Sequence, residues 1–141
     1  MADKLVMTIH VSIKEEDRTE FSGPAGAVIF IPFTGTVEGE LFEGVVRPGG
    51  VDCQRVNQAG VKHMCARYVL EGTDQTGEHC YIFVENNGWF TSGTSNGFDT
   101  VPTFLTDSKA LAPYLHRMAF RGHGEPCPGG VTIRMYEIEG V

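Results

Sequence analysis

Glycine and proline recur along almost the whole chain and leave room only for short regular elements. The 141 residues include 18 glycines and 7 prolines, and the runs between them are rich in Val, Ile, Phe, Tyr and Thr. Glycine and proline favour turns, whereas β-branched and aromatic residues favour strands. This spacing therefore predicts an all-β fold.

Seven of these runs have the pattern of a strand. Residues 5–13 show it most clearly, because Leu5, Met7, Ile9, Val11 and Ile13 recur at every second position, which is the period of a half-buried strand. The other predicted strands are residues 27–35, 40–46, 61–71, 79–86, 118–122 and 131–138.

One segment has helical character, and one is predicted to be a loop. Residues 107–118 could form one or two short turns, capped by Asp107 or Ser108 and interrupted by Pro113. Residues 91–100 have no apolar period, so we expect a crossover loop near one end of the sheet.

An antiparallel sheet of this many strands must protect its edges, and closure into a barrel does so most completely. We therefore expect a single domain over residues 1–141, a closed antiparallel β-barrel of about eight to ten strands with one short helical turn. A barrel of about eight strands has an interior that holds packed side chains or one small ligand.

Composition excludes several classes of partner. Asp and Glu number 18 against 11 Lys and Arg, a formal charge of −7, and the basic residues are scattered, which argues against nucleic acid. The longest apolar stretch, residues 25–33, is too short for a membrane span. The N-terminus has no pattern of a secretory signal, so we expect a cytoplasmic protein.

The sequence offers no motif for a metal or a cofactor, and we expect neither. The four cysteines include no CxxC pair, and the five histidines include no HxH or HExxH pair. No glycine-rich loop opens a helix as a nucleotide phosphate would require. We expect the cysteines to be small buried hydrophobic residues, although Cys65 and Cys80 could pair across a hairpin.

Polar residues in the middle of the chain point to a site. Asp52 follows the turn Pro48-Gly49-Gly50, and two later strands contain Arg67 and Asn86. An acid, a cation and an amide could thus gather on one patch of sheet. The alternatives are that Asp52 caps its own turn and that Arg67 forms a structural salt bridge.

Adjacent strand residues point to opposite faces, so either Arg67 or its neighbour Tyr68 faces inward. If Arg67 does, His63 shares its face and becomes a candidate general base, because imidazole titrates near neutral pH. His116, after the helical segment, is a second candidate catalytic residue or a helix cap.

Short motifs along nearly the whole chain carry a family resemblance. They are residues 33–39, 48–52, 66–68, 86–88, 115–117 with Gly122 and Gly124, and 131–138 with Tyr136. Through them the chain resembles a family of small bacterial and fungal barrel proteins catalogued as domain of unknown function 3237. The resemblance implies a closed antiparallel barrel with a central cavity and places Asp52, Arg67 and Asn86 at the polar positions of the family pattern.

The chain departs from that pattern in three places. Cys53 stands where the family usually has Trp, His116 stands where it tends to have Asn, and the segment between Gly77 and Asn86 is longer. These departures suggest a wider interior and a different ligand, with Cys53 among the contacts.

Three functions fit these observations. The first is a cofactor-independent isomerase, lyase or cyclase for an apolar, oxygenated small molecule, with Asp52, His63 or His116 moving a proton and Arg67, Tyr68, Asn86 and Cys53 binding the substrate. The second is a carrier or sensor of a hydrophobic small molecule. The third is an accessory subunit of another enzyme, and self-association into a homo-oligomer stays open.

Overall fold

The computed structural model describes residues 3–90 and 97–138. Ten strands and two short helical turns follow one another along this part of the chain. The strands are β1 (Lys4–Ile13), β2 (Thr19–Gly23), β3 (Gly26–Glu38), β4 (Phe42–Val46), β5 (Val51–Val56), β6 (Lys62–Asp74), β7 (His79–Phe90), β8 (Phe98–Thr106), β9 (Phe120–Cys127) and β10 (Gly130–Glu137). The turns are η1 (Glu15–Asp17) and α1 (Ala112–Leu115).

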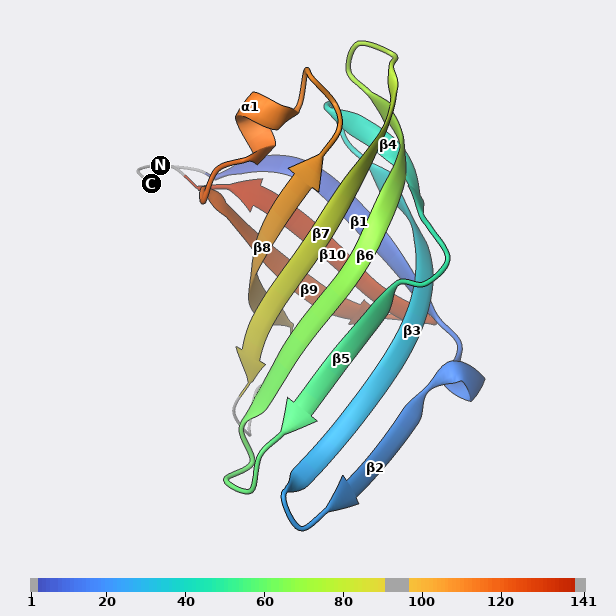
Figure 1. Ribbon diagram of the computed structural model, residues 1–141, viewed down its shortest axis with the longest axis vertical. Helices are drawn as coiled ribbons and strands as arrows, with labels where there is room; N and C mark the ends of the chain where they lie inside the picture. The colour runs from blue at the N-terminus through green and yellow to red at the C-terminus, as the bar shows by residue number, and fades with distance from the viewer. Residues whose placement is uncertain (1–2, 91–96, 139–141) are drawn as a thin grey trace.

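The strands close into an eight-strand antiparallel barrel (Figure 1). Neighbours run in the order β1, β10, β9, β8, β7 and β6, and β4 and β5 then join β6 to β3. The ring closes where β3 pairs with β1, for example with Val37 opposite Ile9. The predicted fold class, a closed antiparallel β-barrel, is confirmed, and the described residues contain two short helical turns instead of the one expected.

β4 and β5 together occupy one place in the ring. β4 pairs with the end of β6, with Val46 opposite Leu70, and β5 pairs with its beginning, with Val51 opposite Arg67. The turn of Pro48, Gly49 and Gly50 separates the two strands, and Gly49 has the positive φ, +104°, that glycine accepts without strain. This interruption brings Asp52 to the start of a new strand.

β2 and β3 form a hairpin that extends at the end of the barrel opposite α1 (Figure 1). β1 pairs with residues 33–38 of β3, whereas β2 pairs with residues 26–30. All five residues of β2 are exposed.

The interior near α1 is an apolar core. Inward-facing side chains from many strands meet there, and Leu111 and Leu115 cover them from the helical segment. The largest fully buried members are Phe42, Phe120, Met7, Ile9, Leu70, Ile82 and Met135. Ser108 accepts a hydrogen bond from the Leu111 N–H (3.1 Å) in the turn before α1. The N-cap of α1 is Leu111, which makes no side-chain cap hydrogen bond, so the prediction that Asp107 or Ser108 caps the helix is wrong.

Each predicted strand overlaps an observed one, but β2, β5 and β8 were not predicted. Most of the loop predicted at residues 91–100 lies outside the described residues, and its last residues, from Phe98 on, form the start of β8. The four cysteines are free thiols, and only Cys80 is buried as predicted. None of the helices within residues 3–90 and 97–138 is long and apolar enough to cross a bilayer.

Candidate functional site

Three of the predicted site residues point into the barrel. Asp52 lies opposite Ala66, and Ala66 lies opposite Asn86, so these residues form one row across β5, β6 and β7. Ala66 and Asn86 are buried, Asn86 completely. Directly paired residues share a face of the sheet, and Tyr68, two residues after Ala66, therefore also faces inward. Its exposed fraction is 3%.

Thr100 of β8 adds a fourth polar group on the inner face of the barrel, two residues before Pro102, which lies opposite Asn86. Its exposed fraction is 2%, and its side chain lies against Gly122 of β9. A Cβ at Gly122 would lie 2.3 Å from the Thr100 hydroxyl oxygen and 3.8 Å from Asn86 Nδ2. The absence of a side chain at Gly122 thus makes room for Thr100 beside Asn86. Thr100 was not predicted, because the buried positions of β8 include Thr100 and Pro102 and so show no hydrophobic alternation in the sequence.

These four side chains share an unusual property. Within the described part of the chain, five of their polar atoms are buried and have no hydrogen-bond partner. These atoms are Asp52 Oδ1, Tyr68 Oη, Asn86 Oδ1, Asn86 Nδ2 and Thr100 Oγ1. A buried polar group without a partner costs about 1–3 kcal/mol. Most buried polar groups in proteins are paired, so a cluster of unpaired ones requires a physical reason.

Burial changes the acidity of two of these groups. Desolvation raises the pKa of Asp52 from 3.8 to about 6, although a hydrogen bond from Gln54 Nε2 to Asp52 Oδ2 (2.7 Å) and the Lys62 charge act in the opposite direction. Desolvation also raises the pKa of Tyr68, and the nearby Asp52 charge raises it further. Tyr68 therefore stays a neutral hydrogen-bond donor, whereas Asp52 changes its charge near neutral pH.

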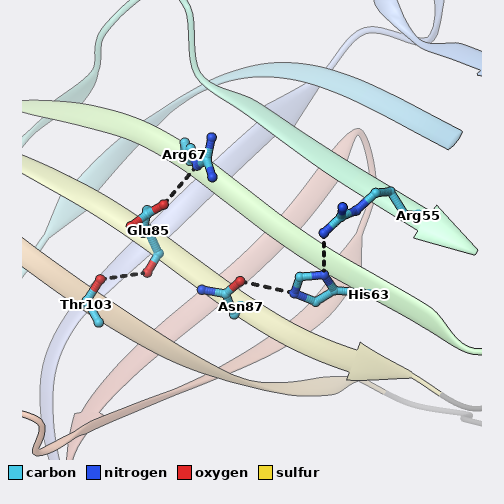
Figure 2. A network of polar contacts seen from close by, with 6 residues as sticks. All are labelled: Arg55, His63, Arg67, Glu85, Asn87 and Thr103. Carbon is cyan, nitrogen blue, oxygen red and sulfur yellow. Dashed lines mark hydrogen bonds and ion pairs between the residues drawn. The ribbon is translucent and has the colours of Figure 1, made fainter.

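Arg67 does not join this interior group. Its side chain is 64% exposed, and its Nε donates a 2.9 Å hydrogen bond to Glu85 on the outer face of the barrel (Figure 2). The expectation that Asp52, Arg67 and Asn86 converge is thus correct for Asp52 and Asn86 and wrong for Arg67. The reason is strand alternation: Tyr68 takes the inward position, and Arg67 finds its partner across the outer face.

His63 and Cys53 also lie on the outer face. His63 contacts Arg55 and Asn87 there, and its ring stacks on Trp89 with the centroids 4.2 Å apart (Figure 2). Cys53 lies opposite Cys65. Cys65 is two residues before Arg67 on β6, so both cysteines face outward, as Arg67 does. Neither His63 nor Cys53 contacts the interior row, so the structure does not bring His63 within reach of a substrate bound beside Asp52.

His116 lies just after α1 and is exposed. Its Nε2 accepts a 3.1 Å hydrogen bond from the Thr106 backbone N–H, which joins the end of α1 to the end of β8. This contact is structural, and His116 also lies apart from Asp52. Among residues 3–90 and 97–138, no three His, Cys, Asp or Glu side chains are grouped as they would be to hold a metal ion.

Comparisons with known proteins agree with this fold and leave the chemistry open. The profile of a family described as protein of unknown function (DUF3237) matches residues 2–138. A UPF0311 protein of Clostridium acetobutylicum is 29% identical over 120 residues, which cover 74% of this chain and 73% of that protein.

Solved structures of similar proteins have the same architecture. A protein of unknown function from Clostridium acetobutylicum superposes with a TM-score of 0.80 at 28% identity, over 99% of this chain and 97% of the other. A β-barrel-like protein from Acinetobacter baumannii has a TM-score of 0.77 at 19% identity, over 96% and 94% of the two chains. A conserved protein of unknown function from Rhodopseudomonas palustris has a TM-score of 0.76 at 24% identity, over 96% of each chain.

Proposed function

We propose that the barrel interior of this chain, which belongs to the family of proteins of unknown function DUF3237, binds a small, oxygenated organic molecule. The description of the family assigns no activity, so we argue from the geometry of the chain's own residues. The observation that carries this proposal is the group of buried polar atoms on Asp52, Tyr68, Asn86 and Thr100 that have no hydrogen-bond partner within residues 3–90 and 97–138. A ligand that hydrogen-bonds to these atoms offsets the free-energy cost of burying them.

The ligand is uncharged in this proposal. Arg67 faces outward, so a ligand carboxylate inside the barrel would lie close to Asp52 without the guanidinium that the sequence suggested would bind it. A carbonyl or hydroxyl oxygen suits the interior better, because Tyr68 Oη and Asn86 Nδ2 can each donate a hydrogen bond to it. Ile31 lies opposite Asp52, Phe33 packs edge-on against Tyr68, and both are buried, so the neighbours of these polar groups favour a hydrocarbon skeleton.

The reaction is a proton transfer, as in a cofactor-independent isomerase, lyase or cyclase. Asp52 is the base, because a carboxyl group with a pKa of about 6 is largely ionised at neutral pH and is more basic than an exposed carboxylate. As Asp52 removes a proton from carbon next to a carbonyl group, negative charge develops on the carbonyl oxygen. Tyr68 and Asn86 stabilise that charge by donating hydrogen bonds.

The Kemp elimination of 5-nitrobenzisoxazole tests this chemistry without knowledge of the natural substrate. A base removes the C–H proton, the N–O bond breaks, and a nitrile and a phenoxide form in one step. We expect kcat/KM to rise with pH through about 6, as Asp52 loses its proton, and then to level off. Asp52→Asn should lower the rate by at least about 100-fold, within the range for loss of a general base.

Two variants of the outer face serve as controls. His63→Ala and Glu85→Gln should leave the rate within about twofold of the unmodified protein, because both residues lie outside the barrel. An equal loss of rate in Asp52→Asn and His63→Ala would contradict the assignment of the base. Binding of 5-nitrobenzisoxazole without product would favour the carrier function over the enzyme.

A further inference from the structure

A second row of side chains crosses the outer face of the barrel at the end opposite α1. Phe21 of β2 lies opposite Val28, Val28 lies opposite Arg55, Arg55 lies opposite His63, and His63 lies opposite Trp89. Directly paired residues share a face, so these five side chains form one continuous line, which we call the Arg55 row. Neighbouring strands are about 4.8 Å apart, so the row spans about 19 Å.

A groove of about 570 Å³ lies along the Arg55 row. It runs between the tip of the β2–β3 hairpin and the tip of the β5–β6 hairpin, and its walls are mostly apolar, with Val56 and Val61 beside the row. This volume is within the range of small-molecule sites, about 300–1,000 Å³. Trp89 and Phe21, which lie at opposite ends of the row, are 68% and 61% exposed.

Arg55 supplies a positive charge in the middle of this groove. No carboxylate in residues 3–90 or 97–138 lies within ion-pair distance of its guanidinium, whereas Arg47 pairs with Glu71 and Arg67 pairs with Glu85. The chain has 18 acidic residues. Although the chain is acidic, the Arg55 guanidinium has no carboxylate partner in the described residues. It is therefore available to bind an anion.

A fixed network holds the Arg55 side chain in place. Its Nη2 lies 3.1 Å from His63 Nδ1, and His63 Nε2 lies 3.1 Å from Asn87 Oδ1 (Figure 2). If His63 carries its proton on Nε2, it accepts from Arg55 and donates to Asn87, so both contacts are satisfied. The imidazole also stacks on Trp89, with 17° between the ring planes. The remaining guanidinium N–H groups can then donate to a ligand.

We propose that this groove is a binding site for a planar aromatic anion, such as an aromatic carboxylate. The carboxylate accepts hydrogen bonds from Arg55, and the aromatic ring packs against Phe21, Val28 and the exposed indole of Trp89. Charge complementarity selects this class of ligand, because the groove combines aromatic and aliphatic walls with an unneutralised cation. The site is independent of the proposed interior function, because the Arg55 row lies on the outer face of the sheet and Asp52 on its inner face.

Trp89 provides a direct readout of binding, because it is the sole tryptophan in the sequence. 2-Naphthoate is added to nitrogen-15-labelled protein, and the indole N–H resonance of Trp89 is followed. We expect a saturable shift of this resonance. Arg55→Gln should weaken the apparent affinity by at least about tenfold, and the uncharged analogue 2-naphthylmethanol should bind the unmodified protein more weakly by a similar factor.

Two further variants show whether binding depends on the Arg55 guanidinium in particular. Arg121→Gln removes an exposed arginine that does not line the groove, and Asp52→Asn alters the interior; both should bind 2-naphthoate as the unmodified protein does. An unchanged affinity in Arg55→Gln, or a Trp89 resonance that does not respond, would overturn the proposal. So would a stable dimer that Arg55→Gln dissociates, because the groove would then be an interface between two copies of this chain.

Discussion

Packing alone does not explain why residue 86 is an asparagine, Asn86. It lies on the inner face of β7 beside Val84 and Ile82, all three fully buried, and neither polar atom of its amide has a partner among the described residues. An apolar side chain of similar size would avoid the cost of burying those atoms. We infer that Asn86 is retained for binding and not for stability.

Asn86→Leu tests this inference at the residue scale. Leucine has the same branching and the same number of side-chain heavy atoms but no polar atoms, so the free energy of unfolding should stay the same or increase, by up to about 3 kcal/mol. The measurement is urea denaturation, with the rate of the Kemp elimination measured in parallel and expected to fall. A variant that unfolds more easily would show that the amide has a structural role.

Gly44 and Gly72 set the spacing of two elements, β4 and β6. They lie opposite each other, and a Cβ at Gly72 would come within 1.9 Å of the Glu43 carbonyl oxygen. A Cβ at Gly44 would come within 2.1 Å of the Glu71 carbonyl oxygen. Backbone atoms in a paired strand cannot move aside as a flexible side chain can, so this contact requires glycine at both positions.

Gly72→Ala should therefore destabilise the protein by at least about 2 kcal/mol, because β4 must shift away from β6. Gly23→Ala is the matched control: a Cβ at Gly23 meets nothing within 4 Å, and its φ lies outside the positive region. Its effect should stay within about 0.5 kcal/mol. Thermal denaturation of both variants checks the difference, and equal melting temperatures would contradict the close contact.

The elements also show where sequence patterns succeed and where they fail. β1 was predicted from its alternation, and Met7, Ile9 and Val11 are indeed buried. Leu5 is 49% exposed, however, because the register shifts between Leu5 and Met7 and places Val6 inside. A bulge of this kind leaves no mark in the hydrophobic period.

β5 and β8 were missed for a reason that concerns the site itself. Their inward positions include Asp52 and Gln54 on β5 and Thr100 and Pro102 on β8. Polar residues inside a barrel remove the alternation by which a strand is detected. The side chains that make the interior a candidate site thus also hid two of the strands that carry them.

The direction of Arg67 illustrates a second limit at the scale of the elements. Arg67 and Tyr68 are adjacent, and either could face inward with a suitable partner, so the sequence left both possibilities open. Pairing with β7 decides between them, because Glu85 lies opposite Arg67 on the outer face. A long-range register of this kind is set by the whole sheet and cannot be deduced from one strand.

At the scale of the whole molecule, closure of the sheet separates two environments. The interior near α1 is filled with apolar side chains, and the interior beyond them contains Asp52, Tyr68, Asn86 and Thr100. The outer face of the same sheet has charged and aromatic side chains, which include the Arg55 row. One sheet thus presents two chemically different surfaces, and their separation depends on the closed ring from β1 to β3.

The most direct test is to titrate the Asp52 carboxyl group, since the proposed base must lie in a desolvated interior. Carbon-13 NMR of the intact protein records the carboxyl-carbon shift of Asp52 against pH, with Asp52→Asn to assign the resonance. We expect a midpoint at about 6, because burial disfavours the charged form. A midpoint near 3.8, the value for a solvated aspartate, would mean that water reaches the carboxylate freely and would contradict the account.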